Sequence, residues 1–371
     1  MNPGNQTKLM KNVSLNRLLL AAPLFCASAA VAQTNAPAVA PIISLEPARP
    51  PMLNRIGISY LMGINISVDY RHLGGLQLSD PGPATGVAVN RYYDNGYNRV
   101  DISGNAGGQT WFWGYSSPNS AQANSMVLQS DATPDTAHSG MYQNHPQSGV
   151  ELTYNRELTR GQKWRMGVEG AFGYMFLSFH DSQTVNYFVN RTSDSFTLNG
   201  VIPPEPPYQG TFEGPGAVIG SEPGSRTTTS VSGAATIMGD RRLDANIFML
   251  RLGPYFEVPL SRKFSITLDG GLTLGYAQST FSFEETVLIS DPFYGINLNS
   301  GPRYGSGSQT DFLIGGYAGA NLGFAISERV RLVGGAMFQS TGRTFNDREG
   351  KSSMLDLGRS VIFSIGATYS F

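Results

Sequence analysis

Eight segments of this chain place an apolar residue at every second position. The first runs from Ile56 to Tyr70, where eight apolar residues alternate with mostly small or polar ones. Because successive side chains of a β-strand point to opposite faces, this period gives a strand one apolar and one polar face. The first segment is long enough to cross a membrane when tilted. The other seven segments are 148–158, 163–176, 244–258, 264–276, 312–326, 330–338 and 360–371.

The connections between these segments alternate between short and long without exception. A soluble β-sandwich gives no reason for such sorting, whereas a membrane barrel has tight turns at its periplasmic end and longer loops at its outer end. In lipid each unpaired backbone group is costly, so the first and last strands must pair and close the barrel. We therefore predict an all-β fold, an antiparallel up-and-down transmembrane β-barrel over residues 56–371 with eight strands. The short connections are 159–162, 261–263 and 327–329, and the long extracellular loops are expected near 71–147, 181–242, 279–309 and 341–357.

The first long connection has a strand pattern of its own. Residues 97–103 and 109–115 flank a glycine-rich turn and predict a hairpin with Trp111, Trp113 and Tyr115 on one face. The hairpin has three interpretations: it extends the wall above the membrane, folds into the barrel mouth, or adds two spanning strands. Barrels of ten or twelve strands are therefore the alternative to eight.

The first 32 residues have the pattern of a secretory signal peptide. Three basic residues precede the apolar run 18–25, and small residues at 30–32 fit a cleavage site. The apolar run is too short to span a bilayer as a helix. A proline-rich stretch follows and predicts an extended periplasmic linker over residues 33–55.

Composition excludes several functions for the processed chain. Cleavage would remove Cys26, the single cysteine, so neither disulfides nor thiol chemistry is expected in the product. It would also remove three of the 26 basic residues and none of the 27 acidic ones. The slight acidic excess that results argues against a nucleic-acid partner.

Taken together, these features resemble bacterial outer-membrane β-barrel proteins, and the small eight-stranded OmpA-like class in particular, over about residues 56–371. The resemblance implies an integral protein of the outer membrane of a Gram-negative bacterium, in contact with membrane lipid and lipopolysaccharide. In that class the terminal strand is a signal read by the barrel-assembly machinery. Phe363, Ile365, Tyr369 and Phe371 match this signal. The long first connection departs from the class, whose loops are shorter.

The rows opposite the apolar ones face the lumen in such a barrel. Eight strands leave an interior just wide enough for side chains to fill it, and an unpaired buried charge is expensive. We therefore predict a network of ion pairs that plugs the lumen, with a narrow charge-lined pore for small solutes as the alternative. The charges of these rows are Asp69, Glu151, Arg165, Glu169, Arg251, Glu257, Asp269 and Arg331.

Catalysis is a remote alternative. His180 with Asp181, and His72 with Asp69, end two strands at the outer rim and would suit a surface hydrolase. Neither a carboxylate dyad of the omptin type nor a serine–histidine spacing accompanies them, and no metal site or cofactor is indicated. We therefore predict a non-enzymatic barrel with a structural or surface-interaction role. The sequence indicates no particular extracellular ligand.

Overall fold

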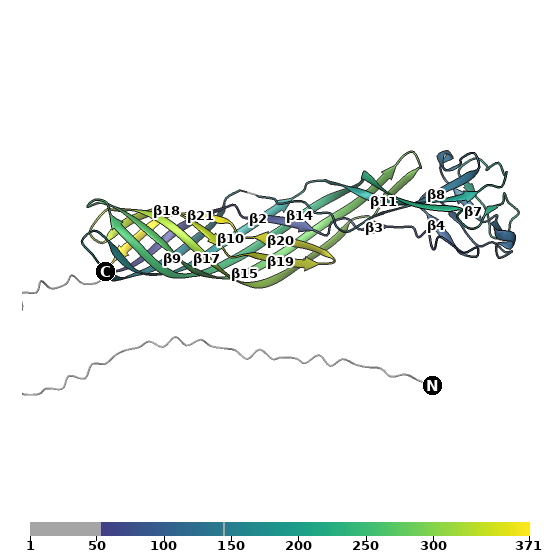
Figure 1. Ribbon diagram of the computed structural model, residues 1–371. Coiled ribbons are helices and arrows are strands. Elements are labelled where there is room, and N and C mark those ends of the chain that lie inside the picture. Colours follow the sequence, from purple (N-terminus) through teal and green to yellow (C-terminus); the bar gives the residue numbers. More distant parts are fainter. Residues whose placement is uncertain (1–52, 144) are drawn as a thin grey trace, which may run out of the picture. The chain divides into compact units, whose positions relative to one another are not determined.

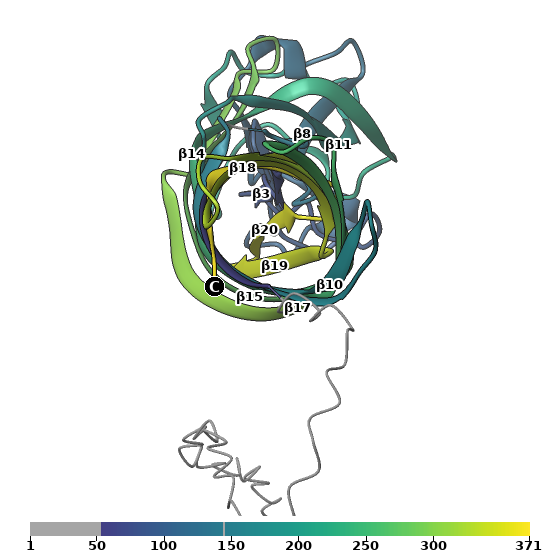
Figure 2. The ribbon, with the colours of Figure 1, turned by 90° about the vertical axis from the view of Figure 1, so that its left-hand side faces the viewer.

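Eight antiparallel strands close into a ring in a computed structural model that describes residues 53–143 and 145–371 (Figures 1 and 2). The predicted signal peptide and most of the predicted linker lie outside the described residues. The eight-strand prediction is confirmed, because the first long connection adds no strand to the ring. In ring order the strands are β1 (Asn54–Ile64), β9 (Gln147–Arg160), β10 (Arg165–Asp181), β14 (Ser225–Pro259), β15 (Phe264–Asp291), β17 (Arg303–Ala325), β18 (Val330–Ser340) and β21 (Ser360–Ser370).

The ring closes between the first and last of these strands. Ile56 of β1 lies opposite Tyr369 of β21. Asn54 and Phe371 extend the pairing, since each backbone N–H donates to the carbonyl oxygen of the other, at 3.2 and 2.9 Å. No edge of the ring is left open, as a lipid environment requires.

The predicted apolar rows lie on the outside of the ring. Examples are Ile58, Leu252, Leu272, Ile314 and Ile365, which are 60–76% exposed. These side chains are not buried between two stacked sheets, so the sandwich alternative is wrong. An outer face of this kind fits hydrocarbon.

Two rows of aromatic side chains border this apolar belt. We call the end of the ring with the short turns the lower end and the opposite end the upper end. At the upper border the cross-strand row is Tyr174, Phe248, Tyr276 and Phe312, with neighbouring ring centroids 5.1–6.2 Å apart. At the lower border Phe264 packs against Phe324 at 5.1 Å. On β15 the borders lie twelve residues apart, which is about 28 Å of height for a strand tilted by about 45°. This height matches the band of about 25 Å that is typical of membrane barrels.

The strands continue far beyond the belt, through much of what the sequence predicts as loops (Figure 1). β14 already begins at Ser225 and β15 ends only at Asp291. The period of two did not reveal this continuation. Within the belt the apolar row points outward, whereas beyond the belt it points inward. The added strands on this sheet are β3 (Leu76–Gln77), β8 (Ser125–Thr133), β11 (Val185–Thr197) and β16 (Ile296–Asn299).

The first predicted strand is shorter than expected. β1 ends at Ile64, and Asn65 adopts a left-handed conformation with φ 57° that turns the chain inward. The prediction that Val68 and Tyr70 face lipid is therefore wrong, since both are fully buried. They belong to β2 (Ser67–Arg71), which forms a small sheet with β20 (Lys351–Asp356) and β19 (Arg343–Arg348). Figure 2 shows β19 and β20 inside the outline of the ring. The core above the belt includes Leu73, Phe179, Ile237, Phe281, Val287 and Leu355.

The first and second long connections of the ring, which we call the first and second excursions, form a separate sheet in the parts that lie farthest from the ring. We call this region the head (residues 80–128 and 194–224). Its strand order is β12-β7-β5-β4, over a core of Trp113, Tyr115, Met126, Leu128, Phe196 and Ile219. The elements are β4 (Arg91–Tyr93), β5 (Gly96–Asn98), β6 (Gln109–Thr110), β7 (Trp113–Tyr115), β12 (Tyr208–Gln209), β13 (Ile219–Gly220) and the 3-10 turns η1 (Ala106–Gly108) and η2 (Pro118–Ser120). No helix in the described ranges is long and apolar enough to cross a membrane.

The predicted hairpin of the first excursion is present only in part. β5 pairs with β7, but Trp113 and Tyr115 are buried, whereas Trp111 precedes the strand and is partly exposed. The expectation of three surface aromatics on one face is therefore wrong. The second excursion supplies the reason, because its β12 pairs with β7 and its Ile219 joins the core over Trp113.

Candidate functional site

The lumen holds one charge cluster near the short turns. Glu257 of β14 is fully buried and accepts hydrogen bonds from Arg55 Nη2 at 2.6 Å and from Arg331 Nη1 at 2.7 Å. Arg165 Nη1 lies 3.9 Å from the same carboxylate. Three arginines from three other strands therefore converge on one acid, which lets all four charges lie inside the wall.

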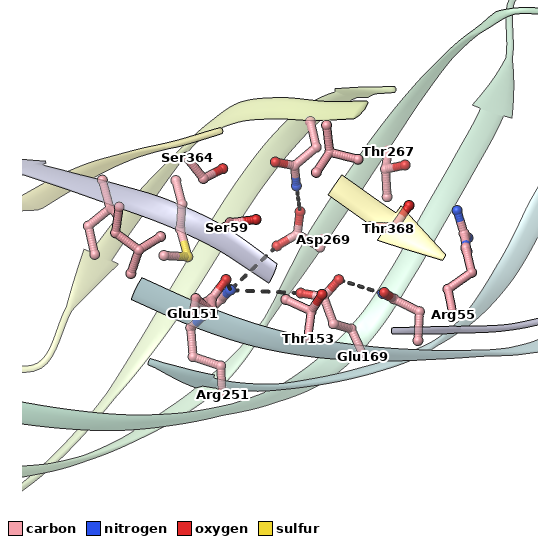
Figure 3. Close-up of a pocket in the computed structure, with 16 residues that line it drawn as sticks. Arg55, Ser59, Glu151, Thr153, Glu169, Arg251, Thr267, Asp269, Ser364 and Thr368 are labelled. Carbon is pink, nitrogen blue, oxygen red and sulfur yellow. Dashed lines mark hydrogen bonds and ion pairs between the residues drawn. The ribbon is translucent and has the colours of Figure 1, made fainter. Parts of the chain in front are cut away.

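A second cluster lies higher in the lumen around Arg251 (Figure 3). Its guanidinium donates two hydrogen bonds to Glu151, at 2.7 and 3.0 Å. Glu169 and Asp269 lie 3.9 and 3.8 Å from it, and the ring of Tyr317 lies 4.5 Å from its Cζ. A planar fork of donors suits such bidentate pairing, because both oxygens of Glu151 are satisfied at once.

Two amides complete the second cluster. Asn155 Nδ2 donates to Glu169 at 2.5 Å, and Asn321 Nδ2 donates to Asp269 at 2.8 Å. The cluster has three acids to one arginine, whereas the cluster around Glu257 has one acid to three arginines. The formal charges of the two clusters therefore balance only when both are taken together.

The structure separates one predicted lumen charge from the rest and adds another. Asp69 lies in β2 and pairs with Arg71 at 2.7 Å, outside both clusters, because the chain turns inward after Ile64. Arg55, which we assigned to the linker, is the second residue of β1 and points inward. Extending the alternation of β1 by one residue toward the N-terminus would have found it.

Buried apolar side chains lie in the lumen above the charges. Leu61, Met175, Met249, Met337 and Ile362 are at most 9% exposed and come from five different strands. The cavity between them and the charges has a volume of about 70 Å³, which is room for a few water molecules. A second cavity among the apolar side chains has about 10 Å³. The lumen thus has a charged lower layer and an apolar upper layer.

A second candidate site lies in the head. The guanidinium carbon of Arg99 lies 4.5 Å from the ring centroid of Tyr92, 4.4 Å from that of Tyr97 and 5.3 Å from that of Phe112. Phe212 from the second excursion packs against Phe112 at 6.2 Å and is 49% exposed. Within the described ranges, the Arg99 side chain makes no ion pair, and its buried Nε has no hydrogen-bond partner. We call these five residues the Arg99 face.

The histidines at the predicted rim are not arranged as expected. His180 Nε2 lies 3.1 Å from Asp240, and both side chains are more than half exposed. Asp181 instead pairs with Arg241 at 3.2 Å inside the core. Asp69 lies 3.7 Å from His138 and not beside His72. Within residues 53–143 and 145–371, His180 and His138 therefore each have one carboxylate as an ion-pair partner and not a dyad.

A closed ring of eight antiparallel strands, an apolar outer belt between aromatic borders and a lumen of paired charges define an outer-membrane β-barrel protein. Solved barrels are similar to it. One is Ail, the attachment invasion locus protein of Yersinia pestis, with 12% identity over 86% of this chain and 99% of Ail and a TM-score of 0.29. Ail has also been solved in complex with the heparin analogue sucrose octasulfate, and that structure gives a TM-score of 0.28.

Two further solved barrels are similar at the same level. The outer membrane protease OmpT of Escherichia coli has 12% identity over 87% of this chain and 98% of OmpT, with a TM-score of 0.34. OprG of Pseudomonas aeruginosa has 9% identity over 85% of this chain and 96% of OprG, with a TM-score of 0.26. No protein-family model matches the chain, and no curated protein sequence matches it.

Proposed function

We propose that this protein is a non-enzymatic outer-membrane barrel with a closed lumen, whose head presents a rigid surface to an extracellular partner. The observation that carries the proposal is the layering of the lumen. Leu61, Met249 and Ile362 are buried above a cavity of about 70 Å³, and this apolar layer supports a lumen without a continuous aqueous path. In this proposal the head supplies the surface that meets the partner.

Conductance tests the closed lumen. The processed protein is reconstituted in a planar bilayer, with a known porin as the positive control. We expect no stable current steps, because ions would have to cross the apolar layer. Stable and reproducible steps would overturn the closed lumen and favour the alternative, a small-solute channel.

The Arg99 face supports the interaction role. Aromatic and arginine side chains dominate the binding energy of protein surfaces, and an arginine held between rings is already ordered before a partner binds. Arg99 has no acidic partner of its own in the described residues. Arrays of extracellular proteins and glycans probed with the purified protein test this role, with Arg99→Ala and Phe212→Ala as variants. Binding that both variants retain in full would contradict the Arg99 face.

The surface hydrolase is the remote alternative. His180 and Asp240 form an exposed pair. Surface hydrolysis assays of wild type and His180→Ala test it. We expect the two proteins to be equally inactive, and activity that only His180→Ala loses would revive the enzyme.

A further inference from the structure

The apolar belt has a hollow where the ring closes. Its volume is about 520 Å³, and it lies on the outer face over β1 and β21 near the short turns. The floor is the backbone around Gly57, which pairs with Thr153 on one side and Thr368 on the other. The lining side chains on the outer face are Ile56, Ile58, Leu152, Val330, Ala367 and Tyr369.

A small side chain deepens the hollow. Across the outer face, Ile58 lies opposite Leu152 on one side and opposite Ala367 on the other, and Ala367 lies opposite Leu332. The alanine methyl group between two long side chains leaves a gap. The hollow faces hydrocarbon. If it stayed empty, its lining side chains would lose dispersion contacts, and an acyl chain can restore these contacts.

A cation lies at the lower end of the hollow. Arg329, in the turn between β17 and β18, is exposed, and its Nη1 donates to the hydroxyl of Tyr369 at 3.3 Å. No ion pair of Arg329 is found among the described residues, including with its neighbour Glu328. Arginine presents a fork of donors that fits phosphate, and here the fork lies next to a tyrosine that lines the apolar hollow.

We propose that the hollow is a binding site for one phospholipid of the leaflet next to the short turns. One acyl chain lies over Gly57 between Ile58 and Ala367, and the phosphate binds Arg329. The hollow offers an apolar surface for the acyl chain, and Arg329 offers a cation without an ion pair for the headgroup. Together they favour a lipid with a phosphate headgroup. This site is independent of whether the lumen conducts and of what the head binds.

Native mass spectrometry of the full-length processed protein in a non-ionic detergent tests the site. The probes are dioleoyl phosphatidylglycerol and dioleoylglycerol, which has the same chains without the phosphate. We expect wild type to retain one phosphatidylglycerol. Dioleoylglycerol, and phosphatidylglycerol on Arg329→Gln, should each bind about tenfold more weakly, as expected for the loss of a charge-assisted hydrogen bond. Ala367→Phe, which places a ring in the path of the acyl chain, should abolish retention of both probes.

Matched controls change the same residue types elsewhere. Ala318→Phe adds a ring to an outward alanine of β17 away from the hollow, and Arg262→Gln removes the arginine of another short turn. Both should bind like wild type, and heat-modifiable migration on a gel verifies that every variant is folded. Equal retention by Ala367→Phe and wild type would overturn the site. A dimer mass that only Ala367→Phe loses would also overturn it, because a second copy would then fill the hollow.

Discussion

The same strands pass through two regions that have opposite interiors. On β15 within the belt, Leu272 and Leu274 point outward and are 68% and 50% exposed, while Thr273 points inward. Above the belt, Phe281 and Phe283 point inward and are buried, while Ser282 points outward. The hydrogen-bonded ladder between β14 and β15 continues through both regions. The medium outside the wall, and not the strand itself, therefore decides which row is apolar.

β14 makes the same change at the same height. Its inward row changes from apolar Met249 to charged Arg251, and its outward row changes from polar Asn246 to apolar Phe248. Phe248 belongs to the upper aromatic border, where aromatic rings are favoured at the boundary of the hydrocarbon. The change of pattern and the aromatic border thus mark one boundary, with a lipid-facing barrel on one side and a protein with an ordinary apolar core on the other.

The largest expected effect comes from the charged interior of the belt. Glu257→Ala leaves Arg55 and Arg331 without their acid inside the wall, which should lower the free energy of unfolding by about 3–5 kcal/mol. Urea titration of the protein in lipid vesicles measures it. Glu284→Ala, on the outward row of β15 above the belt, is the control and should change little. A loss below about 1 kcal/mol for Glu257→Ala would mean that water solvates the arginines and that the lumen is open.

The outward rows test the boundary directly. Leu272→Arg places a charge in hydrocarbon and should cost about 2–4 kcal/mol, whereas Ser282→Arg on the same row above the belt should cost about 0–1 kcal/mol. The same urea titration compares the two variants. Equal costs would break the comparison, because both positions would then face the same medium.

A smaller effect is expected where the chain leaves the wall for the core. Asn65 between β1 and β2 has φ 57°, which costs a residue with a Cβ about 1–2 kcal/mol. Asn65→Ala should therefore lower the free energy of unfolding by about 1 kcal/mol, and Asn65→Gly should not lower it through the backbone. The glycine variant also loses the hydrogen bond from Asn65 Nδ2 to the Arg359 carbonyl, so the difference between the two variants isolates the conformation. If Gly and Ala cost the same, the turn is not what directs β2 inward.

The sequence predicted the ring because lipid imposes one pattern on every spanning strand. Alternation over 264–276 and 312–326 located the belt, and the parity of the loops located the short turns. The inward row of each strand is fixed once the outward row is known, so the same alternation gave candidate lumen charges, of which Asp69 lies outside both clusters, and it missed Arg55. Which charges meet depends on the register between strands, for example Arg251 with Glu151, and alternation within one strand says nothing about register.

The regions above the belt could not be predicted in the same way. Above the aromatic border the inward row is apolar, and a search for lipid-facing rows ends there, at Tyr276 on β15. The head depends on contacts between distant segments, such as the hydrogen bond from Trp113 Nε1 to the Ala217 carbonyl. Asn65 was a local signal that we missed, since asparagine is one of the few residues that adopt the left-handed conformation.

The smallest expected effect is a pH dependence of the head. Burial alone would raise the pKa of Asp101, but hydrogen bonds from the Ser103 hydroxyl at 2.6 Å and from the backbone N–H groups of Trp111 and Asn105 hold that pKa below its usual value. A lowered carboxyl pKa gives stability that is present above the unfolded pKa of about 3.9 and is lost as the pH falls through the folded pKa. Asp101→Asn should therefore make the head less stable at pH 6, and the difference from wild type should shrink toward pH 3.

Hydrogen exchange of the backbone amides of residues 110–113, corrected for intrinsic rates, measures the difference in stability between Asp101→Asn and wild type at both pH values. Glu213→Gln, an exposed acid of the same head, is the control and should match wild type throughout. A difference between Asp101→Asn and wild type that stays constant from pH 6 to pH 3 would show that the loop around Asp101 depends on shape and not on charge, and the head would then be as insensitive to acid as the apolar core beneath it.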